Sequence, residues 1–162
     1  MKKLSFVILL FLGIQLTGQN NATFNELTKI IHDKFPELNI SNKLISVCIW
    51  SSDNQTSRET NKEYQRLYNM YQNAILKDGR RGMVFISISS DKNETFFNIA
   101  VQKDGITKTI AITDLKGAEA GMIKALGMQS PGNAIYSSKG ELFFKDLNKS
   151  NLQASVVSLL TR

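Results

Sequence analysis

The chain has 162 residues, a formal net charge of +6 and a 42% share of hydrophobic residues, which suits one domain with a buried core. Its single cysteine excludes an internal disulfide and a zinc site built from several cysteines. His32 is its single histidine, so a Ser-His-Asp triad or other histidine-based acid–base catalysis would have to use that one residue.

The basic residues are scattered along the chain and interleaved with acids. Their densest cluster is Lys77, Arg80 and Arg81, and Asp78 lies within it. Such a mixed cluster is typical of a solvated loop, so we expect no nucleic-acid partner. We also expect no metal and no cofactor, because His32 has no second ligand near it in the sequence.

Residues 1–18 have the layout of a secretory signal peptide. Lys2 and Lys3 precede an apolar run over residues 4–14, which is too short to span a membrane. An uncleaved N-terminal anchor is the alternative. Gln19 stands where a bacterial lipoprotein signal has its lipidated cysteine, so no lipid anchor can form there. We therefore predict a periplasmic or secreted protein whose mature chain has no membrane span.

Residues 19–39 are predicted to form a helical extension that precedes the main domain. Thr23 and Glu26 fit a capping box, apolar residues then recur at helical spacing, and Pro36 ends the pattern. A near-continuous apolar run over residues 43–50 follows. A run of this kind is typical of a central strand that is covered on both faces.

Residues 54–76 return to a helical pattern, because a stripe of apolar residues falls on one helix face. The stripe consists of Tyr64, Leu67, Tyr68, Tyr71 and Ile75. We interpret it as part of the core, since an aromatic stripe is more often core than a cofactor site. A loop over residues 78–82 then leads to a second predicted strand at residues 83–88.

The rest of the chain continues this alternation. Asn93 is expected to cap a third helix that carries Phe96 and Phe97 and that Gly105 ends. The later patterns predict a short strand at residues 106–112 and a helix at residues 117–126. A hairpin at residues 133–145 and a last amphipathic helix at residues 148–160 follow. The order predicts an α/β domain over residues 40–162, with a mixed sheet and helices on both faces.

The segment between the first strand and the second helix, residues 49–58, reads Ile-Trp-Ser-Ser-Asp-Asn-Gln-Thr-Ser-Arg. It resembles the active-site segment of thioredoxin-like proteins, in particular the exported TlpA and alkyl-hydroperoxide-reductase-like branch. Asn54 and Ser57 stand where that family has the two cysteines of its Cys-X-X-Cys motif. Residues 126–131 resemble the segment that ends at the family's cis-proline, here Pro131. The resemblance implies a thioredoxin-like mixed sheet flanked by helices, with an extra N-terminal helix.

The chain lacks both cysteines that this family uses for its redox cycle. Disulfide exchange needs a thiolate, which neither asparagine nor serine can supply, so we expect no catalytic residue at this site. The resemblance implies a groove beside a cis-proline, where an extended peptide or exported protein could bind by strand addition without a cysteine. The predicted groove residues are Trp50, Asp53, Asn54, Ser57, Ser130 and Pro131.

Two alternatives to a binding module stay open. Asn is among the best N-cap residues, so Asn54 could do no more than start a helix. The chain could also be a thiol–disulfide oxidoreductase or a peroxide-reducing protein that acts through Cys48 or a partner. Cys48 lies within the first predicted strand, and its apolar neighbours indicate a buried and inert thiol.

Overall fold

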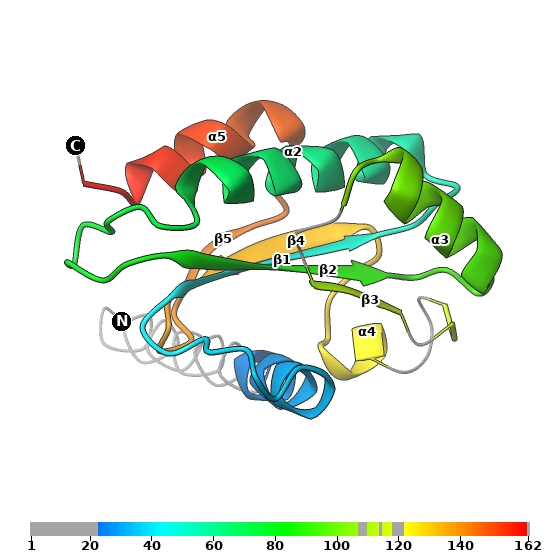
Figure 1. The fold of residues 1–162 in the computed structure, drawn as a ribbon, viewed down its shortest axis with the longest axis horizontal. Helices are drawn as coiled ribbons and strands as arrows, with labels where there is room; N and C mark the ends of the chain where they lie inside the picture. Colours follow the sequence, from blue (N-terminus) through cyan, green and yellow to red (C-terminus); the bar gives the residue numbers. More distant parts are fainter. Residues whose placement is uncertain (1–22, 107–109, 114, 118–121, 162) are drawn as a thin grey trace, which may run out of the picture.

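A five-stranded sheet lies at the centre of the protein, and helices cover both of its faces in this computed structural model (Figure 1). The structure describes residues 23–106, 110–113, 115–117 and 122–161, so the predicted signal peptide lies outside the described residues. Residues 23–34 are helical. The elements that follow are β1 (Leu44–Trp50), α2 (Gln55–Tyr71), β2 (Met83–Ser89), α3 (Glu94–Lys103), β3 (Ile110–Thr113), α4 (Met122–Ala125), β4 (Gly132–Tyr136), β5 (Leu142–Lys145) and α5 (Lys149–Ser158).

The sheet is mixed, as the order of elements predicts, and its strands run in the order β3-β2-β1-β4-β5. β1 pairs with β2, and β2 with β3, in parallel, whereas β4 runs antiparallel to both β1 and β5. Trp50 at the end of β1 lies opposite Ser89 at the end of β2. The loops that leave these two strands therefore meet at one edge of the sheet.

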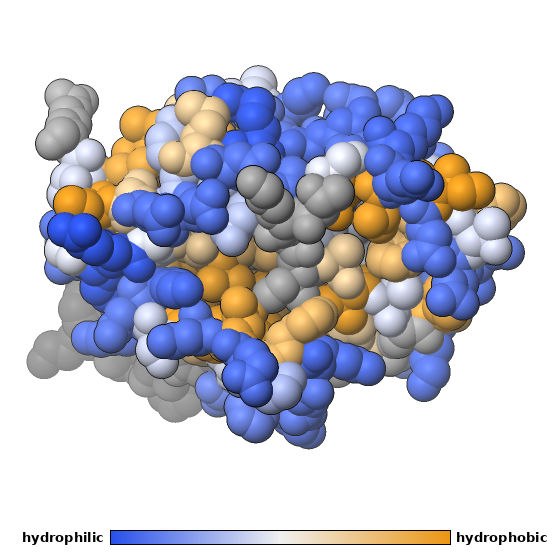
Figure 2. All heavy atoms as spheres, in the orientation of Figure 1, coloured by the Kyte–Doolittle hydropathy of each residue, from blue (hydrophilic) through white to orange (hydrophobic). Residues whose placement is uncertain are grey.

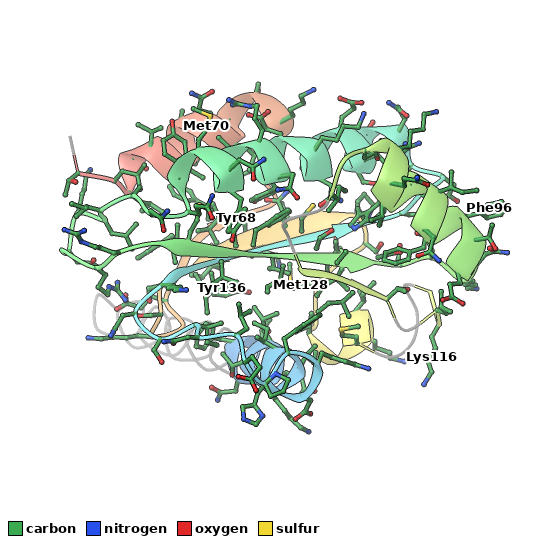
Figure 3. All side chains as sticks on the ribbon, in the orientation of Figure 1. Tyr68, Met70, Phe96, Lys116, Met128 and Tyr136 are labelled. Atoms are coloured by element: carbon green, nitrogen blue, oxygen red, sulfur yellow. The ribbon has the colours of Figure 1, made fainter. Side chains whose placement is uncertain are left out.

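The two faces of the sheet carry separate hydrophobic clusters. The helix over residues 23–34 and α4 lie on one face, and α2, α3 and α5 lie on the other (Figure 1). Tyr136 and Met128 belong to the first layer, while Tyr68 lies between α2 and the sheet (Figure 3). Every residue of β1 and β2 is buried, which is what their near-continuous apolar runs predict. Polar side chains cover much of the surface in the view of Figure 2, and hydrophobic ones gather at α3.

The prediction that a helix extends over residues 54–76 is wrong at its C-terminal end. α2 ends at Tyr71, and Ile75 instead forms an antiparallel bridge with Arg81. A tight turn lies between them, and Gly79 within it adopts a φ of 83°, which few other residues tolerate. The turn removes Ile75 from the apolar stripe and leaves its side chain exposed.

Two later elements are shorter than predicted in the part of the chain that the structure describes. The strand expected at residues 106–112 appears as β3, and the helix expected at residues 117–126 appears as α4. Residues 107–109 and 118–121, which belong to these predictions, lie outside the described residues. Among the residues that are described, no helix is both long and apolar enough to cross a membrane.

Candidate functional site

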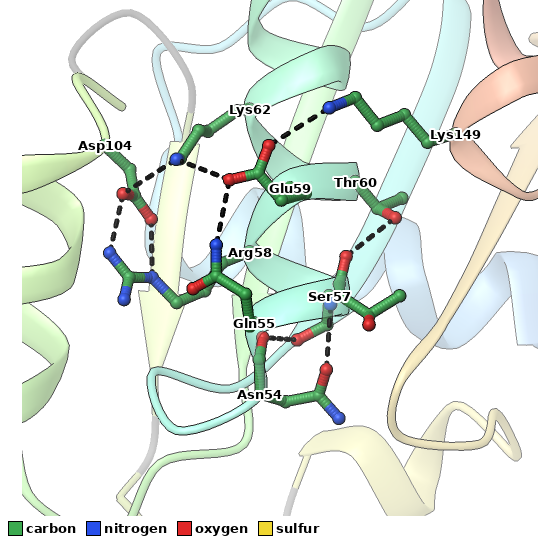
Figure 4. A network of polar contacts seen from close by, with 10 residues as sticks. Asn54, Gln55, Ser57, Arg58, Glu59, Thr60, Lys62, Asp104 and Lys149 are labelled. Carbon is green, nitrogen blue, oxygen red and sulfur yellow. Dashed lines mark hydrogen bonds and ion pairs between the residues drawn. The ribbon is translucent and has the colours of Figure 1, made fainter.

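Asn54 lies at the junction between β1 and α2 and forms the N-cap of α2 (Figure 4). Its backbone is extended, with φ −101° and ψ 100°, and its side-chain oxygen accepts a hydrogen bond from the Ser57 N–H at 2.9 Å. This arrangement satisfies one of the backbone N–H groups that a helix start leaves without a partner. The residue at the first cysteine position therefore has a structural task.

Ser57, at the second cysteine position, is buried and its hydroxyl is occupied within the loop. The Oγ donates to the Asn54 carbonyl oxygen at 2.9 Å and accepts from the Ser51 N–H at 3.2 Å. A serine nucleophile needs a neighbouring base. His32, the one histidine, is exposed on the helix that covers the opposite face of the sheet. The Ser57 hydroxyl is thus held as a structural link.

Asp91 is a central residue of this site that the sequence analysis did not single out. Its buried carboxylate accepts from the Ser52 N–H at 3.0 Å, from the Ser52 hydroxyl at 2.6 Å and from the Ser89 hydroxyl at 2.6 Å. These bonds join the loop before α2 to the end of β2. The sequence does contain a signal for Asp91. The polar residues 89–91 follow the second apolar strand, and adjacent parallel strands end at the same edge of a sheet, where the loop after the first strand also lies.

A third segment reaches the same edge just before β4. The peptide bond between Ser130 and Pro131 is cis. The Ser130 hydroxyl donates to the Ser90 hydroxyl at 2.9 Å, and Ser90 in turn donates to the Trp50 carbonyl oxygen, from its N–H at 2.8 Å and from its hydroxyl at 3.1 Å. The ends of β1 and β2 and the segment before β4 are therefore joined by one chain of hydrogen bonds.

A groove of about 340 Å³ separates the first turns of α2 from the segment before β4. We call it the Pro131 groove, and its walls include Thr56, Ser57, Thr60, Gln129, Pro131, Asn133 and residues 146–148. Asn133 holds the wall opposite α2: its amide donates to the Leu147 carbonyl oxygen at 2.8 Å, and its Oδ1 accepts from the Leu147 N–H at 2.9 Å and the Tyr64 hydroxyl at 3.1 Å. The wall is therefore pre-formed by buried hydrogen bonds.

The backbone that borders the Pro131 groove has unused hydrogen-bonding capacity. The N–H groups of Gln129 and Ser130 form no hydrogen bond with any residue that the structure describes. Gly132 follows directly, and a Cβ at that position would lie 2.7 Å from the Gln129 carbonyl oxygen, so only glycine allows this close approach. Among the described residues, these two N–H groups therefore stay unpaired next to the groove.

The structure divides the predicted groove residues between different places. Ser57 and Pro131 line the Pro131 groove together, whereas Asp53 lines a second hollow on the other side of α2. Trp50, which the resemblance also places in the groove, does not line the Pro131 groove. Its side chain is fully buried, because it ends a central strand and packs against Phe97 of α3 with ring centroids 6.0 Å apart.

Ion pairs surround the first turns of α2 (Figure 4). Arg58 donates from Nε and Nη2 to the two carboxylate oxygens of Asp104, at 2.8 and 2.7 Å. Hydrogen bonds from Lys62 and Lys149 lower the pKa of Glu59 to about 2. Glu59 thus links the start of α2 to the start of α5.

Cys48 is buried, as the apolar run around it predicts. It contributes to the floor of the Pro131 groove, but only 1% of its surface is exposed. Burial raises the pKa of its thiol well above the ordinary value. The thiol therefore stays protonated, and the thiolate that attacks a disulfide does not form at ordinary pH.

Comparison with solved structures finds proteins of similar fold at low sequence identity. A thiol-disulfide oxidoreductase from Bacteroides fragilis superposes with a TM-score of 0.60 at 22% identity, over 74% of this chain and 83% of that one. The thioredoxin domain of a thiol-disulfide oxidoreductase from Bacteroides vulgatus gives 0.62 at 16% identity, over 75% and 81%. A secreted disulfide oxidoreductase from Mycobacterium tuberculosis gives 0.56 at 12% identity, over 74% and 84%.

No protein-family model and no curated protein matches the chain. The structural likeness, at identities below a quarter, establishes the fold and leaves the activity to be argued from the site. The chain has the thioredoxin-like fold that the resemblance implies, and with one cysteine in its sequence it lacks the Cys-X-X-Cys pair.

Proposed function

We propose that this chain is an exported thioredoxin-like protein that binds an extended polypeptide segment in the Pro131 groove without thiol chemistry. The observation that carries the proposal is that the N–H groups of Gln129 and Ser130, beside a pre-formed groove, form no hydrogen bond with a described residue. A bound segment would pair with this backbone as an added strand, which supplies main-chain hydrogen bonds without any cysteine.

The lining of the groove suggests how such a segment would be held. Cys48 and Ile49 form an apolar floor that suits a small apolar side chain. Thr56 lies exposed at the mouth, and its hydroxyl forms no hydrogen bond with a described residue, so it can bond to the backbone of the segment. Asp146 and Asn148 lie on the opposite wall and add polar contacts. A segment that alternates small apolar and polar residues would fit this lining.

The competing proposal, an oxidoreductase that acts through Cys48, has less support. The thiol is buried, and burial raises its pKa, so both access and thiolate formation are unfavourable. Asn54 and Ser57 cannot replace the missing thiols, because neither an amide nor a hydroxyl supplies a thiolate, and both side chains are already used in hydrogen bonds at the helix start. Export of the chain rests on the charged and apolar layout of residues 1–18, and N-terminal sequencing of the purified protein should find a start near Gln19.

Binding can be tested by nuclear magnetic resonance with a ¹⁵N-labelled chain and a thiol-free unstructured probe, S-carboxymethylated insulin B chain. We expect the amide signals of Gln129 and Ser130 to shift on titration. Thr56→Arg fills the mouth of the groove and should abolish these shifts, whereas Asn73→Arg, an exposed site beyond the end of α2, should leave them unchanged. Shifts that avoid the groove, or that persist in Thr56→Arg, would refute the proposal.

A further inference from the structure

A second hollow, of about 320 Å³, lies on the side of α2 that faces away from the Pro131 groove. We call it the α3 hollow. Its lining includes Asp53, Arg58, Phe96, Ile99, Ala100 and Lys103. The four α3 residues follow the spacing i, i+3, i+4 and i+7, so they form one stripe along that helix. The hollow is thus an apolar stripe of α3 that faces the loop before α2.

The apolar part of this hollow is open to solvent. Phe96 is 61% exposed and Ile99 is 55% exposed. Phe96 lies at the outer end of α3 (Figure 3), and hydrophobic side chains gather in the same region of the surface (Figure 2). Phe97, the next residue, points the other way and packs on Trp50. Phe96 and Ile99 thus place two large apolar side chains in solvent on one face of α3.

The α3 hollow has the features that allow it to pair with itself. Phe96 protrudes at its edge, and an apolar depression lies beside that side chain. A two-fold axis brings the same patch of both copies together, so the Phe96 of each copy could enter the hollow of the other. One acidic side chain, Asp53, and two basic ones, Arg58 and Lys103, also line the same patch, so a two-fold pairing can set Asp53 of each copy against Lys103 of the other.

These two charges are available for such contacts. Lys103 forms no ion pair with a residue that the structure describes, and Asp53 accepts only from the neighbouring Ser51 hydroxyl. Arg58, the other charge in the hollow, is already occupied by both oxygens of the buried Asp104 carboxylate. The ionic contacts at this surface would therefore come from Asp53 and Lys103.

We propose that the α3 hollow is the interface of a homodimer, in which two copies of this chain pair about a two-fold axis. The exposed apolar surface is small, so the dimer belongs to the weak class of interfaces, with a Kd on the order of 10 µM. The proposal does not depend on binding in the Pro131 groove, which lies on the other side of α2.

Sedimentation equilibrium of the purified protein tests this proposal. We expect a reversible monomer–dimer equilibrium. Phe96→Ser should raise the Kd about tenfold or more, because each dimer loses two buried rings. Met70→Ser is the matched control, since Met70 is 51% exposed on α2 and lies outside the α3 hollow, and its Kd should equal that of the natural chain.

Charge exchange tests the predicted pairing across the axis. Asp53→Lys and Lys103→Asp should each weaken the dimer severalfold, because each variant opposes like charges. An equimolar mixture of the two variants, and the double variant, should both recover association. A chain that stays monomeric at all concentrations, an unchanged Kd in Phe96→Ser, or no recovery on mixing would each overturn the proposal.

Discussion

The start of α2, where thioredoxin-like proteins carry their cysteines, is built much like the starts of α3 and α5. All three helices have an Asn N-cap, Asn54, Asn93 and Asn148, whose side-chain oxygen accepts from the backbone N–H three residues later. The distances are 2.9, 3.2 and 3.1 Å. The chain thus uses the same cap at the position where thioredoxin-like proteins have their first cysteine and at two other helix starts. Asn54 therefore needs no functional explanation.

The difference between the three helix starts lies in what surrounds the cap. The loop before α2 is joined to β2 through Asp91, to its own helix through Ser57 and, through Ser90, to the segment before Pro131. The starts of α3 and α5 are exposed caps. The start of α2 therefore differs from the other two helix starts in the hydrogen bonds that tie it to neighbouring segments.

We expect the largest loss of stability from Asp91→Ala. The substitution leaves the donors of the half-buried Ser52 and the buried Ser89 without their acceptor, so the free energy of unfolding should fall by about 2 to 4 kcal/mol. Urea denaturation measures the loss. Asp53→Ala, an exposed carboxylate in the same loop, should cost no more than about 0.5 kcal/mol. Equal losses in the free energy of unfolding for the two variants would show that the hydrogen bonds of Asp91 do not stabilise this loop.

Ser57→Ala comes next in size. It removes the hydroxyl that joins Ser51 and Asn54, and we expect a loss of about 1 to 2 kcal/mol in the free energy of unfolding. The neighbouring Thr56 is exposed, and its hydroxyl has no hydrogen-bond partner among the described residues, so Thr56→Ala should change stability by less than about 0.5 kcal/mol. The same urea titrations compare the two.

The three caps themselves should be nearly equivalent. Asn54→Ala, Asn93→Ala and Asn148→Ala should each cost about 1 kcal/mol, the usual loss for a cap of this type. A double-mutant cycle separates the sites. Asn54→Ala and Ser57→Ala remove two different hydrogen bonds that join the same two residues, so their effects should couple, whereas Asn93→Ala should add to Ser57→Ala independently. A loss at Asn54 several times larger than at the other two positions would break the equivalence.

The smallest effect concerns the link between the starts of α2 and α5, and it depends on pH. Lys62 and Lys149 lower the pKa of Glu59 from its ordinary 4.5 to about 2. A carboxyl with a lowered folded-state pKa contributes its full stability above pH 4.5 and loses it as the pH falls toward 2. Urea midpoints measured across this range should fall less in Glu59→Gln than in the natural chain. Lys149→Met should give an intermediate slope, and identical slopes in all three proteins would rule out this contribution.

Much of the fold could be predicted from local patterns, whereas the contacts of the site could not. The apolar runs at β1 and β2 specify buried strands regardless of their partners. The apolar stripe predicts a helix as far as Ile75, but α2 ends at Tyr71. Apolar spacing alone does not show where a helix stops. Asp91 contacts a loop about 40 residues earlier in the chain, and no local pattern contains that pairing. The exposure of Phe96 is likewise set by which face of α3 meets the sheet.

The chain has the thioredoxin-like fold but carries no cysteine at the start of α2, and reduction of insulin disulfides in the presence of dithiothreitol measures whether the chain has thiol chemistry. We expect no rate above the reagent alone for the natural chain, and a clear gain for Asn54→Cys/Ser57→Cys, which places thiols at the start of α2. Activity of the natural chain that disappears in Cys48→Ala would show instead that Cys48 is a redox thiol.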